Sequence, residues 1–402
     1  MKNLGLPKKI LYCKKCVISN QRPSSTVEFK SKKTKKKDTI FFDKEGICDA
    51  CNFNKIKSTI NWSQRDKDLE KLLKKFRKSN GEYDVIVPGS GGKDSAFTSH
   101  ILKYKYGMNP LTVTWSPHLY TDIGWKNFEN WSKIGGLDNI LFTPNGRLHS
   151  YLTQQSFLNL LHPFQPFILG QRIIGPLFAS KYNVKLVMYG ENQAEYGNKS
   201  AENKNPKMND AFFTIKNNDM ITLGGKTIKN IINNTEFKIQ DFQPYIPLKK
   251  DYILKKKIEV HYLGYYLKWD PQECYYYASE NTGFQANEER TEGTYSKYSS
   301  IDDKIDMFHY YTTLIKFGIG RATYDASQEI RNNKITRDEG ISLVKKYDQE
   351  FPERYFKDFL NYIQIDKNKF FKTIDQYRSN HIWIKKRNKW KLKNPIWNEK
   401  KF

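Results

Sequence analysis

The stretch YDVIVPGSGGKDSAF, residues 83–97, decides the fold class of this sequence of 402 residues. A short run of β-branched residues ends in glycines, and the residues after them have the apolar spacing of a helix. The free backbone N–H groups and the dipole of such a helix form an anion site. The stretch differs from the common P-loop, where Ser or Thr follows the lysine, because Asp94 follows Lys93 here. We expect a strand, a phosphate-binding loop and a helix, and the alternative is a glycine-rich turn without a ligand.

Similar apolar runs recur along the chain and alternate with longer segments. Strands are expected in PLTVTWS, NILFTP and VKLVMYGEN, residues 110–116, 139–144 and 184–192, and helices over 123–134 and 170–183. This alternation predicts an α/β fold, with a parallel sheet and helices on both faces. Ligands of such sheets lie beyond the carboxyl ends of the strands. Three expected strand ends carry suitable groups, namely Ser90 to Ser95, Trp115 with Ser116, and Gly190 with Glu191 and Asn192.

Four of the five cysteines form two C-x-x-C pairs near the start of the chain, Cys13 with Cys16 and Cys48 with Cys51. Their separation is close to the zinc-ribbon spacing, in which two knuckles bind one metal ion tetrahedrally. We expect zinc, and the alternatives are a redox pair, an iron–sulfur site or four unliganded thiols. Cys274 stands alone in a bulky aromatic setting and is expected in the core.

The sequence divides into three predicted parts. Residues 1–60 form a zinc-ribbon-like module, residues 61–260 the α/β domain with an insertion or lid at about 200–250, and residues 261–402 a mainly helical substrate or partner region. In this last region, Thr336 is expected to cap a helix with an acidic first turn, and a further helix is expected over 366–383.

The formal net charge is +25, and lysine far outnumbers arginine. Because asparagine and isoleucine are also abundant, an AT-rich coding bias explains the average charge better than a nucleic-acid partner does. A polyanion is considered only for the run KSKKTKKKD, residues 30–38, which is otherwise a solvated loop. The sequence has neither an apolar run of bilayer length nor a secretory h-region, which predicts a cytoplasmic protein with no membrane span.

The hexapeptide SGGKDS resembles the PP-loop of the N-type ATP pyrophosphatases, a HUP-like superfamily that cleaves ATP between the α and β phosphates and transfers AMP to a carbonyl oxygen. A wider set of motifs narrows this resemblance. The set comprises YCKKCVISNQRPSSTVEF, GICDACN, VPGSGGKDSAF, HPFQPFILGQR, YGENQAEYGN, RTEGTYSKYSSIDDK and KFGIGRATYDASQEIRNNKITRDEG. Together these motifs resemble the N-acetyl sugar amidotransferase family, of the WbpG and PseA type, over most of the chain.

The resemblance implies an enzyme that converts the acetamido group of a bacterial surface sugar into an acetamidino group, through an O-adenylyl intermediate that reacts with ammonia. The implied substrates are sugars of the pseudaminic, legionaminic or diacetamido uronic acid type, free or nucleotide-linked, for lipopolysaccharide (LPS), O-antigen or flagellin glycan biosynthesis. The implied cofactors are ATP, Mg²⁺ and Zn²⁺.

Carried onto this sequence, the resemblance places the nucleotide at the loop. The expected nucleotide-binding residues are Gly89, Ser90, Gly91, Gly92, Lys93, Asp94, Ser95, Trp115, Gly190 and Asn192. Lys93 would neutralise the departing pyrophosphate, Asp94 would hold magnesium, and Glu191 would assist proton loss from ammonia. The expected sugar-binding residues are His162, Gln165, Gln171, Arg172, Thr294 and Tyr295. The alternative roles are packing for Trp115 and His162, a favourable charge at the helix N-terminus for Asp94, and a loop cap for Glu191. The aromatic- and hydroxyl-rich stretch from Arg290 to Asp303 suits sugar recognition, with polar loop packing as its alternative.

Ammonia is mostly ammonium at neutral pH, and the sequence shows neither an N-terminal catalytic cysteine nor the surroundings of a triad glutaminase nucleophile. The resemblance therefore implies a separate glutaminase subunit, HisH-like and accompanied by a HisF-like barrel. The rival function is a PP-loop tRNA thiolation enzyme, which would need a catalytic thiol or cluster at the ATP site. Only Cys274 lies outside the two cysteine pairs. A zinc adaptor that binds nucleic acid through its basic segments is a third interpretation, which leaves the loop unexplained.

Overall fold

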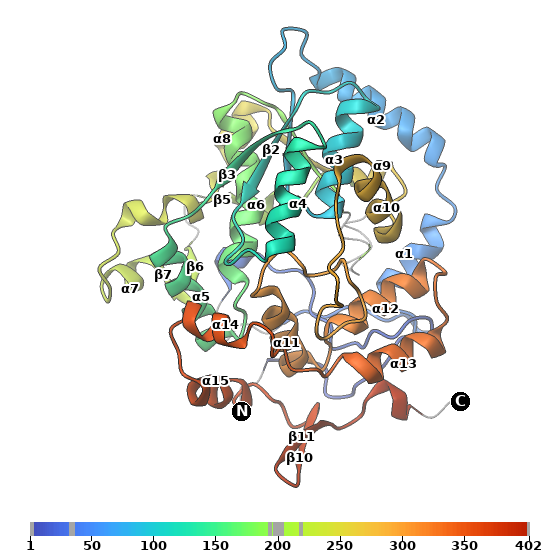
Figure 1. Ribbon diagram of the computed structural model, residues 1–402, viewed down its shortest axis with the longest axis vertical. Coiled ribbons are helices and arrows are strands. Elements are labelled where there is room, and N and C mark those ends of the chain that lie inside the picture. Colours follow the sequence, from blue (N-terminus) through green and yellow to red (C-terminus); the bar gives the residue numbers. More distant parts are fainter. Residues whose placement is uncertain (1–3, 32–36, 192–194, 196–204, 217–219, 400–402) are drawn as a thin grey trace.

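A five-stranded parallel sheet forms the centre of the molecule (Figure 1). The computed structural model describes residues 4–31, 37–191, 195, 205–216 and 220–399. In order across the sheet, the strands are β3 (Asp138–Phe142), β2 (Pro110–Trp115), β1 (Val85–Pro88), β4 (Leu186–Tyr189) and β9 (Glu259–Tyr262). The strand order reverses between β1 and β4, and ligands of open α/β sheets bind at such a switch point.

Three of the strands lie within the segments predicted for them and β3 begins one residue before its segment, whereas β9 is not among the predicted strands. This edge strand has four residues and pairs in parallel with β4 along its whole length. The segment around it alternates between the polar residues Glu259 and His261 and the apolar residues Ile258, Val260 and Tyr262, which are buried in one cluster. This period of two is a strand signal that the prediction missed, and its short length makes the strand depend on pairing with β4.

Helices cover both faces of the sheet, which confirms the predicted fold class. Val85 and Val87 point to one face and Ile86 points to the other, as alternation along a strand requires. The helices around the sheet are α2 (Trp62–Phe76), α3 (Lys93–Tyr104), α4 (Asp122–Lys133), α5 (Gly146–Leu160) and α6 (Gln165–Lys181). Of these, α2 and α3 pack on the face of Val85, and α5 and α6 on the face of Ile86. The helices predicted over 123–134 and 170–183 correspond to α4 and α6.

The described part of the 200–250 insertion packs into the main core. Its elements are η4 (Asp210–Phe212), β5 (Thr214–Ile215), β6 (Thr222–Leu223), β7 (Lys226–Thr227), α7 (Ile228–Ile232), η5 (Ile239–Tyr245) and β8 (Leu248–Lys249), and α8 (Lys250–Lys256) follows. Phe212, Leu223, Phe242 and Tyr245 are buried in the same apolar cluster as the sheet residue Ile86. This burial favours a structural insertion over a lid.

The region after β9 is mainly helical, as predicted. Its helices are α9 (Leu263–Tyr266), α10 (Pro271–Thr282), α11 (Asp306–Phe317), α12 (Arg321–Arg331), α13 (Arg337–Tyr347), α14 (Phe356–Tyr362) and α15 (Lys367–Asp375). Thr336 caps α13 in a capping box with Glu339, whose carboxylate accepts from the Thr336 amide at 2.7 Å. The basic tail forms an antiparallel hairpin of β10 (Trp383–Lys386) and β11 (Lys389–Leu392), followed by η6 (Ile396–Asn398).

The helix predicted over 366–383 is wrong beyond Asp375. Trp383 is buried and its indole N–H donates to the carbonyl of Ile315 at 2.8 Å. Arg387 and Asn388 have positive φ and turn the chain back into the hairpin. Burial of the aromatic residue against α11 overrides the helical spacing of this segment.

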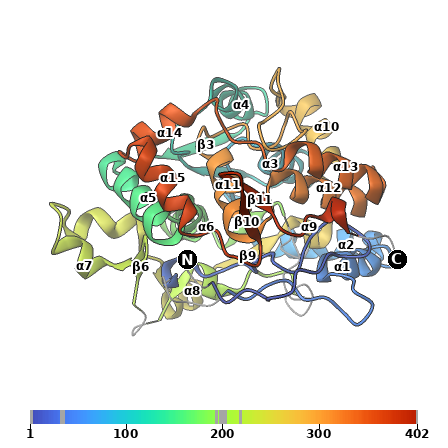
Figure 2. The same cartoon turned by 90° about the horizontal axis from the view of Figure 1, so that it is seen from below.

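The N-terminal module packs against the C-terminal helices. It contains η1 (Glu28–Lys30) and α1 (Asp49–Lys57), and α1 lies beside α12 in Figures 1 and 2, where Asn54 Nδ2 donates to the carbonyl of Arg331 at 2.8 Å. The side chain of Arg337 donates to the carbonyls of Cys13 and Cys16, each at 3.2 Å. Of the basic run 30–38, residues 32–36 lie outside the described part of the chain.

None of the described helices combines the length and the apolar character needed to cross a bilayer.

Two helical glycines provide a test of the packing between β2 and α6. A Cβ added at Gly170 would lie 2.2 Å from the ring of Trp115, whereas a Cβ at Gly146 would meet no heavy atom within 4 Å. We expect Gly170→Ala to destabilise the fold by about 1 to 3 kcal/mol through overpacking. Gly146→Ala should be neutral or stabilising by up to about 1 kcal/mol. Urea denaturation of both variants checks this, and equal midpoints would contradict the packing argument.

Candidate active site at the phosphate loop

The loop between β1 and α3 turns tightly because its glycines allow close contacts. Gly91 has a φ of +84°, and a Cβ there would lie 2.8 Å from the Cα of Phe128 in α4. A Cβ at Gly89 would lie 2.1 Å from the Cβ of Ser95. Gly92 is the N-cap of α3, so the first amides of α3 lack partners within the helix. Bare N–H groups and the positive end of α3 thus meet at one point, which suits an anion.

This loop lines a cavity of about 600 Å³ at the carboxyl ends of β1 and β4. The cavity is lined by every expected nucleotide-binding residue that the structure describes, from Gly89 to Ser95 together with Trp115 and Gly190. Asn192 lies outside the described residues. Trp115 reaches the cavity wall, but it is only 2% exposed and packs between Phe142 and Tyr245. This burial favours packing, the alternative role for Trp115, over contact with the nucleotide.

Lys93 and Asp94 form an ion pair at the start of α3. Asp94 Oδ2 accepts from Lys93, and Asp94 Oδ1 accepts from the indole N–H of Trp269 at 3.0 Å. Burial is the largest single influence and would lower the pKa of Lys93, but the charge of Asp94, its hydrogen bond and the nearby Cys274 and Glu191 together raise it. Lys93 is therefore a cation at neutral pH, facing the cavity.

Cys274 lies behind this ion pair. Its side chain is only 2% exposed, and burial, followed by the charge of Asp94, raises the pKa of its thiol. It is absent from the described cavity lining, although its neighbours Asp270 and Gln272 belong to that lining. Cys274 is thus a neutral core thiol next to the site, as the sequence predicts.

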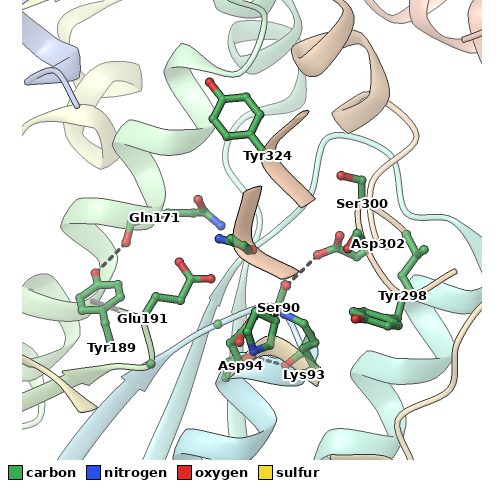
Figure 3. A pocket seen from close by; sticks show the side chains of 18 of the residues that line it. Ser90, Lys93, Asp94, Gln171, Tyr189, Glu191, Tyr298, Ser300, Asp302 and Tyr324 are labelled. Atoms are coloured by element: carbon green, nitrogen blue, oxygen red, sulfur yellow. Dashed lines mark hydrogen bonds and ion pairs between the residues drawn. The ribbon is translucent and has the colours of Figure 1, made fainter. Parts of the chain in front are cut away.

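The end of β4 contributes a second set of polar groups. A Cβ at Gly190 would lie 2.8 Å from Thr98 Oγ1, so only glycine lets β4 end this close to α3. Glu191 follows and lies on the same side of the cavity as Gln171 of α6 (Figure 3). The hydroxyl of Tyr189 donates to the backbone carbonyl of Gln171 at 2.8 Å. An amide and a carboxylate therefore face the loop from one side.

The opposite side of the cavity comes from a C-terminal segment. Tyr298, Ser300 and Asp302 lie across the loop from Glu191 (Figure 3). Asp302 Oδ2 accepts a hydrogen bond from the hydroxyl of Ser90 at 2.8 Å. Burial raises the pKa of the Asp302 carboxyl, and the hydrogen bond from Ser90 opposes part of that rise. A carboxylate thus touches the loop that is expected to bind phosphate.

The far end of the cavity is formed by α12 and by the N-terminal module. The guanidinium of Arg321 pairs with Asp325 at 3.0 Å and lies 4.4 Å from the ring centre of Tyr310. The guanidinium of Arg22 lies 5.8 Å from the ring centre of Tyr324, and both residues line the cavity. Two arginines and two tyrosines therefore line this part of the cavity.

Several of these residues are missing from the sequence-based site. The cavity-lining residues of α12 are Arg321, Tyr324, Asp325, Gln328 and Glu329. Their spacing of three and four is that of one helical face, and this polar face is a signal that sequence reasoning could have used. Asp302 lies in the aromatic- and hydroxyl-rich stretch from Arg290 to Asp303, but only the tertiary structure brings it into contact with Ser90 of the loop. Arg22 carries no such local signal, and only the tertiary structure brings it to the cavity.

Four of the six expected sugar-binding residues, His162, Gln165, Thr294 and Tyr295, do not line the cavity. Gln165 is fully buried and donates to the carbonyl of Glu28 at 2.8 Å, and His162 lies 3.4 Å from the Glu28 carboxylate. Thr294 donates to Asp325 at 2.6 Å, and Tyr295 donates to Glu329 at 2.9 Å. The structure gives these residues supporting contacts. The other two, Gln171 and Arg172, line the cavity.

The four paired cysteines form a separate cluster. All four Sγ atoms lie within 4.8 Å of one another, with 3.8 Å between Cys13 and Cys51 and 3.8 Å between Cys16 and Cys48. Tetrahedral Zn–S bonds of about 2.3 Å place the sulfurs about 3.8 Å apart, so the spacing fits one ion. A four-iron cluster binds each thiolate to a different iron and would need wider spacing. The cluster is therefore a candidate single-metal site.

Comparisons with known proteins extend this description. Residues 292–396 match the family described as "LPS biosynthesis protein WbpG-like, C-terminal domain", which confirms the expected resemblance for this part of the chain. An uncharacterized protein of Methanocaldococcus jannaschii is 35% identical over 80 residues, which are 20% of this chain and 28% of that protein. The match thus spans less than a third of the relative's own length.

The solved structures that match part of this chain include three enzymes. NH3-dependent NAD synthetase from Campylobacter jejuni is 16% identical and covers 34% of this chain and 59% of its own, with a TM-score of 0.28. NMN synthetase from Francisella tularensis is 13% identical and covers 75% and 96%, with a TM-score of 0.31. The U34-tRNA thiolase NcsA from Methanococcus maripaludis, solved with its 4Fe-4S cluster, is 12% identical and covers 84% and 87%, with a TM-score of 0.32. Similarity at this level is too low to carry an assignment of function.

Substitution of one cysteine inside the cluster and of one outside it tests the candidate metal site. We expect the protein to contain about one metal ion per chain, and Cys16→Ser to lose it together with much of the folding free energy of the module, since bound zinc contributes on the order of 10 kcal/mol in such modules. Cys274→Ser should keep the metal, because Cys274 lies outside the cluster. Elemental analysis and thermal unfolding measure both effects. Full metal content in the Cys16 variant would contradict the four-cysteine site.

Proposed function

We propose that this protein is an ATP-dependent N-acetyl sugar amidotransferase that releases AMP and pyrophosphate. Its substrate would be a bacterial surface sugar of the pseudaminic, legionaminic or diacetamido uronic acid type, whose acetamido group becomes acetamidino. One observation carries the proposal. The phosphate loop and the segment that matches a WbpG-like domain line the same cavity, and they are joined by the hydrogen bond between Ser90 and Asp302.

The reaction follows from the poor electrophilicity of an amide. The amide oxygen attacks the α-phosphorus of ATP, the bond to pyrophosphate breaks, and the amide nitrogen loses its proton to give an O-adenylyl imidate. Ammonia then adds to the imidate carbon, and AMP leaves with the electrons of the C–O bond. After loss of a proton, the oxygen of the acetamido group has been replaced by nitrogen. The two steps replace one substitution that would have to expel oxide.

The residues at the loop are suited to the first step. Backbone N–H groups at Gly91 and Gly92 and the cation of Lys93 would bind the leaving pyrophosphate, whose charge grows as the bond breaks. Carboxylates beside the loop could hold Mg²⁺, which would neutralise the phosphates. Gln171 and Glu191 face the loop from one side, where they would orient the amide and remove a proton from ammonia.

The far end of the cavity is suited to an anionic sugar. Arg22 and Arg321 would bind a carboxylate or a nucleotide phosphate, since guanidinium groups bind such groups with two parallel hydrogen bonds. Tyr310 and Tyr324 offer flat apolar faces beside hydroxyl donors, which is typical of sugar sites. Ammonia would come from a separate glutaminase subunit, HisH-like with a HisF-like barrel.

The alternative is a tRNA thiolation enzyme. Such an enzyme would need a reactive thiol or a sulfur-carrying cluster at the ATP site. The spacing of the four paired cysteines fits a single ion, and the remaining Cys274 is a buried neutral thiol. Both observations favour amidation.

A direct assay tests the proposal. Incubation with ATP, Mg²⁺, ammonium and candidate acetamido sugars, free and nucleotide-linked, should form AMP together with a product about one dalton lighter than the sugar. Mass spectrometry and nucleotide chromatography measure the two products. Release of ADP and orthophosphate by the active enzyme would contradict the proposed chemistry.

Replacement of one loop cation tests its role. Lys93→Ala should reduce kcat by roughly 100-fold or more, because a positioned charge at the developing pyrophosphate is removed. Lys133→Ala is the matched control, since Lys133 is exposed on α4 and forms an ion pair with Glu129 at 3.0 Å. Equal rates for both variants would remove Lys93 from the mechanism.

Replacement of the lone thiol separates amidation from thiolation. Cys274→Ala should keep sugar amidation within about a factor of two when the fold is intact, because the thiol has no chemical role in that reaction. Loss of activity in a variant with wild-type thermal stability would favour thiolation instead.

A further inference from the structure

Asp302 occupies an unusual position for a carboxylate. It accepts from the hydroxyl of Ser90 at 2.8 Å, within the loop where an anionic ligand is expected. Figure 3 shows this contact reaching the loop from the side opposite Glu191. A phosphate bound by the amides around Ser90 would lie next to a negative charge.

The backbone at Asp302 is held against α4 and cannot move aside easily. The amide of Thr121 donates to the carbonyl of Asp302 at 3.2 Å. A Cβ at Gly124 would lie 2.5 Å from the Cα of Asp302, so α4 and this segment are in direct contact. The next residue, Asp303, accepts from the amides of His118 and Ile305 at 2.8 and 2.9 Å. The carboxylate of Asp302 is therefore fixed near the loop.

The two charges of the Lys93–Asp94 pair do not offset this repulsion. Lys93 is shared between Asp94 and the expected phosphate, and both carboxylate oxygens of Asp94 accept hydrogen bonds, so the pair does not also cancel the charge of Asp302. Burial and the neighbouring Asp303 raise the pKa of Asp302 more strongly than Arg321 lowers it. Like charges at short range in a partly buried site repel strongly. A divalent cation between the carboxylate and the phosphates turns that repulsion into attraction, because Mg²⁺ is commonly bound by one or two carboxylates together with substrate phosphates.

Building on the proposed use of ATP, we propose that Asp302 makes the loop selective for the magnesium complex of a nucleoside triphosphate. In this role, Asp302 helps to hold the cation when it is present and repels the triphosphate when it is absent. Asp302 belongs to the same segment as Tyr298 and Ser300, which also line the cavity. The magnesium complex bound at Asp302 would therefore contact the C-terminal wall of the cavity directly.

A binding experiment with opposite expected signs tests this role. The probe is the α,β-methylene analogue of ATP, titrated into the full-length protein by calorimetry with Mg²⁺ or with EDTA. Asp302→Asn keeps an oxygen that can accept from Ser90 and removes the charge. We expect this variant to bind the magnesium complex about 10-fold more weakly and the metal-free analogue several-fold more tightly than the wild type does. Asp138→Asn is the control, since Asp138 lies at the start of β3, at the other end of the sheet.

The possible results distinguish a failure of the role proposed for Asp302 from a failure of the proposed ATP-dependent function. If the Asp302 variant changes both affinities in the same direction, or changes neither, the inference is overturned while the nucleotide site stands. If the wild type binds the analogue under neither condition, the proposed function fails as well. Should the Asn variant not fold, the wild type alone decides. It should prefer the magnesium complex by at least about 10-fold, and a ratio near one overturns the inference.

Discussion

The main chain at Gly91 and Gly190 passes where no side chain fits, and the arrangement of the cavity depends on this close approach. A Cβ at Gly91 would meet the backbone of α4, and one at Gly190 would meet α3. Gly91 therefore lets the loop after β1 lie against α4, and Gly190 lets the end of β4 lie against α3. The N–H groups of the first turn of α3 become accessible to a ligand because no side chain shields them. A larger residue at either place would separate the elements that make the site.

The cavity is assembled from three distant parts of the chain. The loop and Glu191 come from the α/β domain, Asp302 and α12 from the C-terminal region, and Arg22 from the module with the paired cysteines. The four cysteines of this module are buried in one apolar cluster with Phe317 and Ile319, so the candidate metal site packs against the C-terminal region. A metal ion bound by the four thiolates would stabilise the module, which has little core of its own, and would thereby fix the position of Arg22.

The charged groups around the cavity are arranged as local pairs. Lys93 forms an ion pair with Asp94, and Arg321 forms one with Asp325, which follows it by one turn of α12. Each pair keeps its charges near neutral while the site is empty of phosphate, which limits the cost of burying them. A bound anion would share the cations of these pairs, so little reorganisation is needed when charge develops during a reaction. The contact between Ser90 and Asp302 differs because a hydroxyl cannot neutralise a carboxylate.

The sequence by itself determined the strand, the phosphate loop and the helix from residue 85 onwards, the four predicted strands and the cysteine spacing. These features are local, since glycine placement, alternation and helical periodicity act over a few residues. Only the tertiary structure shows that β9 pairs with β4 and that Trp383 packs on α11 outside a helix. It also shows that Gln165 is buried behind the cavity wall, where it donates to Glu28. The tertiary structure likewise brought Asp302 to the loop and Arg22 to the cavity wall. Their positions depend on contacts between residues far apart in the chain, such as Ser90 with Asp302, and no local pattern encodes such a contact.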